Sequence, residues 1–283
     1  MWFDEQYAQL KIDQIHSLEI QNSIKQMREQ GYTLLPNVLE AEDCKAVIDD
    51  FYQFCANNKD HADQYKMSTG RHSRLANLHG ISDATLQCAM KPRLIELLDV
   101  IFDAKTALNT SLTFEQGSEQ DIHRDTPFFW SKPHSGEYVG VWFALEDVQD
   151  DAGPLRYIPG GHNIRLNMED VFQGTDARDR FLRYNQRLHE EIANRQLEEK
   201  RLLISRGDVL IWHPELPHGG SAIKNPGTTR FSMVCHYMPD GAYVLSPGVF
   251  LGLEADRNIM DYKELSTGRR MRDTGYPAFL PNY

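Results

Sequence analysis

The sequence predicts a mainly β domain with flanking helices, in which short antiparallel strands form a sandwich or a barrel. Three observations lead to this fold class. Short β-like runs follow one another between residues 106 and 239, separated by Gly, Pro, Asp and Asn clusters that favour turns. Residues 1–105 have mainly helical periodicity, and a polar stretch at about 167–200 has helix-forming composition. Many short strands joined by turns are typical of closed or two-layered antiparallel folds.

The first part of the chain contains three helical patterns around one short strand. Ile20, Ile24 and Met27 follow helical spacing, and Gly31 stands where that helix would end. The stretch "GYTLLPNVL" then predicts a strand that ends at its proline. Apolar residues of "EAEDCKAVIDDFYQFCANN" lie on one helical stripe, and "PRLIELLDVIFD" begins with Pro92, which the first turn of a helix tolerates.

The β part is expected to continue as one domain to the end of its strands. The runs that predict strands are "ALNTSLTFEQ", "QDIHRD", "YVGVWFALEDV", "GPLRYIPG", "RLLISRGDVLIWH" and "RFSMVCHYMP". We expect residues 167–200 to form a helical insertion between strands, and residues 240–283 to form a tail packed on the core. The sequence contains no internal repeat or low-complexity linker, so we expect a single domain over residues 1–283.

Composition and charge exclude several classes of partner. A chain of 283 residues with 41% hydrophobic content can bury a sizeable core, and its formal charge of −11 repels nucleic acid and anionic lipid. No apolar run is long enough to cross a bilayer, and the start lacks the pattern of a secretory signal, so we predict a cytoplasmic protein. The cysteines form no CxxC pair and are expected to be reduced and buried: Cys44, Cys55, Cys88 and Cys235. The sequence predicts no particular oligomeric state.

The run "QDIHRDTPFFW" is the first candidate for chemistry. His123 and Asp125 are two residues apart, so on a strand they would point to one face while Arg124 points to the other. Imidazole beside carboxylate fits a divalent metal, an acid/base pair or a buried hydrogen bond. A second His-x-Asp, at His61 and Asp63, follows a predicted helix and is expected to be a solvated turn.

The second candidate is "GDVLIWHPELPHGGSAIKNPGTTRFSMVCHY". His213 and His218 are five residues apart, so a regular strand would turn only one of them towards the barrel. Arg230 opens a later apolar strand, with Ser232 on the same face. Two histidines and one carboxylate form the facial metal site of non-haem Fe(II) oxygenases, and a buried arginine could pair with the carboxylate of an acidic co-substrate.

Together these motifs resemble the phytanoyl-CoA dioxygenase family of Fe(II)/2-oxoglutarate oxygenases. The resemblance is carried by "IHRD", "GVWFALEDVQDDAGPLRYIPGGH", "GDVLIWHPELPHGGS" and "TTRFS", and covers roughly residues 33–239. It implies a double-stranded β-helix, which is a cupin-like jelly roll. The implied iron ligands, which are also the catalytic residues, are His123, Asp125 and His218.

The resemblance also implies a site for 2-oxoglutarate. Arg230 would hold the distal carboxylate of the co-substrate, Trp142 would pack near it, and Ser232 would either contact it or only fill space. Two positions depart from the family's pattern. Arg124 stands where many members have glutamine, and Gly220 stands where some have serine.

Two segments beside these motifs are candidates for binding the substrate. The loop "STGRHSRLAN" carries Arg71, His72 and Arg74, which form a basic cluster in an acidic chain. It is either a solvated loop or a site that attracts a carboxylate, phosphate or phosphonate. Phe128 begins an aromatic run expected at the mouth of the barrel.

The resulting hypothesis is an enzyme that uses Fe(II), 2-oxoglutarate and O2 to hydroxylate a small organic metabolite, with anionic metabolites as the first candidates, releasing succinate and CO2. Asp125 argues against a halogenase, which would need that ligand position for chloride. A metal-dependent hydrolase could use the same ligands but would have no need of Arg230. The third alternative is a jelly-roll protein that binds a ligand without turnover.

Overall fold

A large antiparallel sheet forms the centre of the computed structural model, which describes residues 1–72, 74–132, 137–254 and 278–279. Its strand order is β1-β8-β5-β10-β3-β2-β12. These strands are β1 (Tyr32–Leu35), β2 (Leu75–Ala76), β3 (Thr106–Phe114), β5 (Val139–Ala144), β8 (Val209–Trp212), β10 (Ser232–Pro239) and β12 (Ala278–Phe279). A smaller sheet, of order β7-β6-β9, comprises β6 (Leu155–Tyr157), β7 (Lys200–Arg201) and β9 (His218–Gly220). A further pair joins β4 (Ser131–Lys132) to β11 (Tyr243–Val244).

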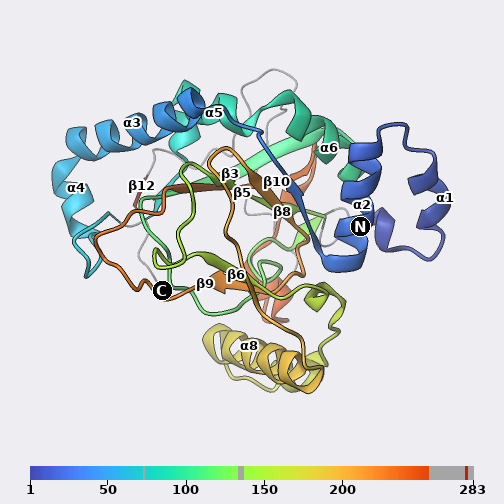
Figure 1. Ribbon diagram of the computed structural model, residues 1–283. Helices are drawn as coiled ribbons and strands as arrows, with labels where there is room; N and C mark the ends of the chain where they lie inside the picture. Colours follow the sequence, from blue (N-terminus) through green and yellow to red (C-terminus); the bar gives the residue numbers. More distant parts are fainter. Residues whose placement is uncertain (73, 133–136, 255–277, 280–283) are drawn as a thin grey trace.

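Helices flank this β core on two sides. Those before β3 are η1 (Trp2–Asp4), α1 (Ala8–Asp13), α2 (Leu18–Gln30), α3 (Ala41–Asn57), α4 (Lys59–Gln64), η2 (Leu78–Gly80), α5 (Asp83–Ala89) and α6 (Pro92–Phe102). Those after β6 are η3 (Gly161–Asn163), α7 (Met168–Phe172), α8 (Ala177–Asn194) and α9 (Pro247–Phe250). Helices α3, α5 and α6 cover one side of the large sheet, whereas α8 lies beyond the smaller sheet (Figure 1).

Helix α2 illustrates how the sequence sets the element boundaries. It begins where the hydroxyl of Ser17 accepts a hydrogen bond from the Ile20 amide, at 3.4 Å. It ends at Gly31, which has a φ of 79°, in the left-handed region that favours glycine. A side chain at this position would also come within 2.6 Å of the His162 ring. The sequence prediction of a helix that stops at this glycine is therefore correct.

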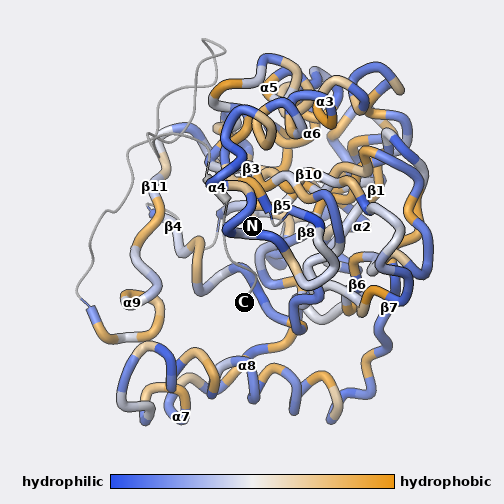
Figure 2. Tube along the Cα trace, turned by 90° about the vertical axis from the view of Figure 1, so that its left-hand side faces the viewer, coloured by the Kyte–Doolittle hydropathy of each residue, from blue (hydrophilic) through white to orange (hydrophobic). Residues whose placement is uncertain are grey.

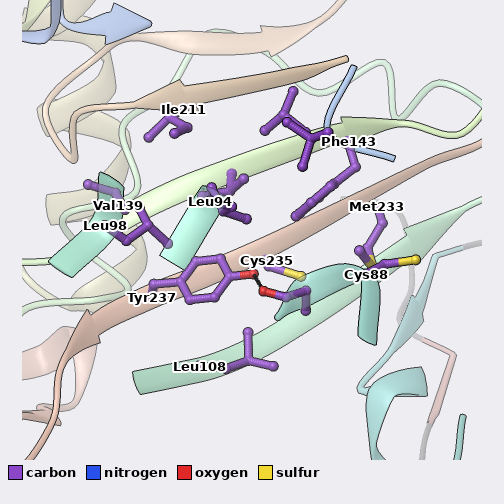
Figure 3. Close-up of a cluster of buried hydrophobic side chains, with 14 of the residues drawn as sticks. Cys88, Leu94, Leu98, Leu108, Val139, Phe143, Ile211, Met233, Cys235 and Tyr237 are labelled. Carbon is purple, nitrogen blue, oxygen red and sulfur yellow. Dashed lines mark hydrogen bonds between the residues drawn. The ribbon is translucent and has the colours of Figure 1, made fainter. Parts of the chain in front are cut away.

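One face of the large sheet packs against the helices. Alternate residues of its strands point to this face and meet apolar side chains of α5 and α6, as Figure 3 shows for Val139, Phe143, Ile211, Met233, Cys235, Tyr237, Cys88, Leu94 and Leu98. The buried hydroxyl of Tyr237 donates a 2.6 Å hydrogen bond to the carbonyl of Ala89, so the one polar group of this ring is satisfied. All four cysteines are buried and free, as the sequence predicted.

The opposite face of the large sheet looks towards the smaller sheet. Its side chains form a second apolar cluster with residues of β6: Trp142, Ala144, Leu210, Trp212, Val234, Leu155 and Tyr157. The period-two pattern of β5, β8 and β10 thus sends one set of side chains to the helices and the other between the sheets. This two-sheet arrangement is the predicted jelly roll.

The polar stretch before β7 forms helices α7 and α8. Figure 2 shows that hydrophilic and hydrophobic residues alternate along α8, as expected of an amphipathic helix. Its apolar side joins a small cluster that contains Val171, Tyr184 and Leu251. Helix α8 therefore packs against the segment around α9 rather than against the large sheet.

Three strand predictions differ from the structure. The run at 120–125 is not a strand: pairing there is limited to one bridge between His123 and His218, and the Asp121 carboxylate accepts a 2.8 Å hydrogen bond from the next amide. The run at 201–213 is divided between two sheets, because the backbone turns at Gly207, which has a φ of 89°. The first hundred residues contain two strands instead of one, since β2 pairs with β3.

The end of the chain is described only in part. Strand β11 and helix α9 lie within residues 240–254, and β12 pairs with β2 through Ala278 and Phe279. The remainder of the predicted tail, including its "GRRMRD" run, lies outside the described residues. No described helix has both the length and the apolar composition that a bilayer crossing requires.

Gly140 gives Trp212 its place between the sheets. The two residues are partners across β5 and β8, and a methyl group on Gly140 would overlap the indole ring. Because the ring is rigid and fully buried, the backbone would have to move instead.

We predict that Gly140→Ala lowers the free energy of unfolding by about 1–3 kcal/mol, the usual effect of overpacking a core. Urea titration followed by far-UV circular dichroism measures the change. Gly227→Ala is the control, because a side chain there meets only the end of Asn225 at 3.2 Å. Equal stabilities of the two variants would contradict the prediction.

Candidate metal and co-substrate site

Three predicted site residues lie together between the two sheets. His123 and His218 form an isolated antiparallel bridge, with backbone N–H to O distances of 2.9 Å in both directions. Asp125 follows two residues later, so its carboxylate faces both rings. Its Oδ1 lies 3.8 Å from Nε2 of His123, and its Oδ2 lies 3.6 Å from Nε2 of His218.

Backbone carbonyls orient the two imidazoles. Nδ1 of His123 lies 2.7 Å from the carbonyl of Asp121, and Nδ1 of His218 lies 3.0 Å from that of Leu216. A ring that donates from Nδ1 to a carbonyl keeps the lone pair of Nε2 for a metal. Burial lowers the pKa of His218 to about 4, which keeps this imidazole neutral at neutral pH, as ligation requires.

The carboxylate of Asp125 is buried and charged. Burial opposes its ionisation, but the nearby rings of His218, His236 and His123 outweigh this effect and hold its pKa below the ordinary value. The indole Nε1 of Trp212 also donates a 2.9 Å hydrogen bond to Oδ2.

This donor set fits a divalent first-row metal ion. The three candidate ligand atoms of His123, Asp125 and His218 lie within 4.8 Å of one another, close enough to share one ion. Two neutral imidazoles and one carboxylate would occupy three positions and leave others for exogenous ligands. His213 is turned elsewhere, with Nε2 3.0 Å from the carboxylate of Asp4, which accounts for the odd spacing of the two histidines.

Arg230 is a buried cation near this group. It is 3% exposed, its Nη2 donates to Oγ of Ser232 at 3.3 Å, and its guanidinium carbon lies 5.4 Å from the centre of the Trp142 ring. No salt bridge to Arg230 occurs in the described part of the chain, and its Nε has no hydrogen-bond partner there. Burial lowers the pKa of Arg230 to about 10, although the charge of Glu146 acts in the opposite direction. The site is therefore suited to an incoming carboxylate.

One cavity of about 370 Å³ is lined by both the His–Asp–His group and Arg230. The predicted site residues that line it are His123, Asp125, His218, Arg230, Trp142, Arg74 and Phe128. Ser232 is not among the residues that line the cavity, and it accepts a hydrogen bond from Arg230 instead. Phe128 stands at the mouth, 42% exposed, with its ring 5.1 Å from that of Phe181 on α8.

Arg71 does not line this cavity, so its predicted contact with substrate is corrected. Its Nη1 lies 3.1 Å from Oε1 of the buried Glu115, and its Nη2 donates to the carbonyl of Gly227. The amide of His72 donates to the same carboxylate at 2.8 Å. These contacts fix the loop and direct Arg74, only 7% exposed, into the wall of the cavity.

Residues 27–232 match the phytanoyl-CoA dioxygenase family (PhyH), which is more than half of the 283-residue chain. The chain belongs to this family.

Curated relatives match less than half of the chain. Phytanoyl-CoA dioxygenase domain-containing protein 1 of Danio rerio is 29% identical over 46% of this chain and 43% of the relative. The peroxisomal phytanoyl-CoA dioxygenase of Homo sapiens is 28% identical over 42% of this chain and 33% of the relative. The match thus spans less than half of the length of either relative.

Solved structures share the fold. The epimerase SnoN, in complex with Fe3+, alpha ketoglutarate and nogalamycin RO, has a TM-score of 0.66 and 19% identity over 90% of this chain and 98% of that chain. The carbocyclase SnoK has a TM-score of 0.63 and 17% identity, over 89% and 96%. EctD from S. alaskensis, with 2-oxoglutarate and 5-hydroxyectoine, has a TM-score of 0.61 and 14% identity, over 81% and 78%. The predicted jelly roll is confirmed. Two of the predicted cofactors, iron and 2-oxoglutarate, are named as ligands of these neighbours: iron, as Fe3+, and alpha ketoglutarate in the SnoN complex, and 2-oxoglutarate in the EctD complex.

The two departures from the phytanoyl-CoA dioxygenase pattern have structural reasons. Arg124 points away from the cavity, where its Nη1 lies 2.8 Å from Oε2 of Glu215 and its Nη2 donates to the carbonyls of Gly161 and Ile164. A side chain at Gly220 would come within 2.6 Å of the amide nitrogen of Glu119. Arg124 thus stabilises the segment that carries His123 and Asp125. Gly220 allows its strand to lie close to the backbone of Glu119.

Sequence reasoning missed several residues of the cavity. His236 and Trp212 both contact Asp125, and Gln120 contributes to the lining. Alternation along β10 could have found His236, because it continues the series of Arg230 and Ser232 on one face.

The lowered pKa of Arg230 means that its charge opposes folding at neutral pH when no anion is bound. We predict that Arg230→Met raises the free energy of unfolding of the ligand-free protein by about 1–4 kcal/mol, as when other buried charges are replaced by apolar residues. Urea unfolding measures this.

Added 2-oxoglutarate supplies the second part of that test. At 100 times its Kd, a ligand stabilises a protein by about 2.7 kcal/mol, and we expect this gain in wild type but not in Arg230→Met. Arg195→Met, at the exposed residue that follows α8, is the control. An Arg230→Met variant that is less stable without ligand, or still stabilised by it, would be evidence against this account of Arg230.

Proposed function

We propose that the chain is an Fe(II)- and 2-oxoglutarate-dependent dioxygenase that hydroxylates a small, anionic organic metabolite and releases succinate and CO2. The observation that carries the proposal is the pairing, within one cavity, of the His–Asp–His group with a buried arginine that has no carboxylate partner among the described residues. A hydrolase would use the three ligands but leaves Arg230 unexplained.

Each residue has a distinct task in this proposal. His123, Asp125 and His218 would hold Fe(II), and Arg230 would pair with the distal carboxylate of 2-oxoglutarate against Trp142. The iron centre, with 2-oxoglutarate and O2, supplies the oxidising chemistry. The protein contributes ligation, orientation and the exclusion of water.

The lining of the cavity supports exclusion of water. Phe128 and Phe129 follow the ligand segment, and Leu112, Phe114 and Val234 line the cavity from the large sheet. An apolar wall around a reactive site limits side reactions with solvent.

The substrate would bind at the part of the cavity that carries Arg74. This buried guanidinium supports an anionic substrate, since a charge-assisted hydrogen bond in a desolvated site is strong. We propose hydroxylation because the curated relatives are named dioxygenases. The structural neighbours SnoN and SnoK catalyse other outcomes, since they are named an epimerase and a carbocyclase. We retain the cytoplasm as the proposed location, which agrees with the four free cysteines.

We predict that the chain converts 2-oxoglutarate into succinate in the presence of Fe(II) and O2, and that His218→Ala lowers this rate by more than about 100-fold. Loss of a ligand should exceed the 10–100-fold effect typical of residues that only support ligands. Succinate is measured by NMR, with and without O2. His213→Gln is the matched control, because His213 lies outside the candidate ligand group.

Two results would contradict the proposed function. One is a wild-type chain that binds Fe(II) but never consumes 2-oxoglutarate, which would favour the binding protein. The other is hydrolytic turnover without 2-oxoglutarate, which would favour the hydrolase.

For the substrate, we predict that Arg74→Gln raises KM by about tenfold or more, matching the loss of a charge-assisted hydrogen bond of about 1.5–3 kcal/mol. A screen of anionic metabolites that reports succinate formation identifies the substrate. The slow turnover of 2-oxoglutarate without substrate should be unchanged in this variant, because Arg230 is intact. Arg195→Gln is the control, and an unchanged KM in Arg74→Gln would refute the predicted anion contact.

A further inference from the structure

A third histidine lies beside the candidate ligand carboxylate. His236 comes from β10, is 3% exposed and lines the cavity. Its Nε2 lies 3.5 Å from Oδ2 of Asp125, the same oxygen that accepts the 2.9 Å hydrogen bond from Trp212. Two N–H groups, from β8 and β10, are therefore close to one carboxylate oxygen.

The imidazole of His236 is held in place from several sides. It stacks on Phe129, with ring centres 4.2 Å apart and an angle of 22° between the planes. Tyr138 lies next to both rings. The cross-strand neighbours of His236 are Thr110 and Gly140, and the absence of a side chain on Gly140 is what admits the indole of Trp212.

Packing alone does not account for a histidine at this position. Nδ1 of His236 is buried and has no hydrogen-bond partner among the described residues. An unpaired polar atom in a core is costly, and an apolar ring would stack on Phe129 without that cost. The feature that an apolar ring could not reproduce is the N–H beside Asp125.

We propose that His236 is a positioning residue for the metal site, which with Trp212 holds the carboxylate of Asp125 in the orientation that metal binding requires. An N–H at Nε2 of this ring would donate to Oδ2. This inference rests on the proposed function only in requiring that His123, Asp125 and His218 bind a divalent metal. Donors of this kind change metal affinity by about 10–100-fold.

The test is a titration of the metal-free, full-length chain with Mn(II), in which the EPR signal of free Mn(II) reports the dissociation constant. His236→Phe keeps a ring on Phe129 but has no N–H group. His236→Asn keeps an amide that is too short to reach Asp125, whereas the longer amide of His236→Gln can donate to it. We expect the Phe and Asn variants to bind Mn(II) about 10–100-fold more weakly, and the Gln variant to recover most of the affinity.

A control and a double-mutant cycle separate positioning from packing. Met238→Leu changes the next residue of β10 on the same face without a polar group, and should leave the affinity unchanged. The thermal midpoint of each metal-free variant is measured alongside. Because Trp212 and His236 act on one oxygen, the losses in Trp212→Phe and His236→Asn should be non-additive.

The outcomes distinguish this inference from the proposed function. Wild-type affinity in His236→Asn, or equal weakening in the Asn and Gln variants, overturns the role of His236 while the metal site stands. A wild-type chain that binds no Mn(II) overturns the metal site and this inference with it. If His236→Phe does not fold, the contrast between Asn and Gln decides.

Discussion

The backbone bridge between His123 and His218 is the constraint on which the candidate site depends. It joins a segment that leaves the large sheet to strand β9 of the smaller one, and brings the two rings to 4.7 Å between centres. The bridge requires glycine on one side, because side chains at Gly219 and Gly220 would meet the backbone of residues 119–121. Once this pairing is made, Asp125 must turn back towards both rings. A metal site thus follows from a short piece of β pairing and not from a long regular strand.

The two buried charges of the cavity, on Asp125 and Arg230, differ in whether the protein itself neutralises them. The carboxylate of Asp125 is compensated within the protein, by surrounding histidines and by the indole of Trp212. Among the described residues, Arg230 contacts Ser232 and aromatic faces but forms no salt bridge, so the folded protein keeps a buried charge at a cost to its stability. Such a cost is typical of functional sites, where local rules of stability are broken for the sake of binding. An anionic co-substrate would supply the missing compensation.

The sequence predicted the helices, the two-sheet fold and the grouping of His123, Asp125 and His218, because period and motif order determine these. The assumed reason was partly wrong: the first two residues share a face through a bridge and a turn, not through a strand. The alternation of side chains that begins at Arg230 also predicts that His236 points to the same face. The fate of Arg71 could not be predicted, since a cluster of basic residues does not reveal which one meets Glu115. Contacts between distant segments decide such cases.

Glu115 shows how such a contact connects the loop that carries Arg74 to the backbone of Arg230. Its carboxylate is near Arg71 and accepts a hydrogen bond from His72, and through them it fixes the loop that leads to Arg74. Its carbonyl accepts a 3.0 Å hydrogen bond from the amide of Arg230. Arg74, which is expected to meet the substrate, and Arg230, which is expected to meet the co-substrate, are thus both tied to Glu115, the residue that directly follows β3. Because the core around β3 is close-packed, this shared attachment favours a constant spacing between the backbones that carry the two cations.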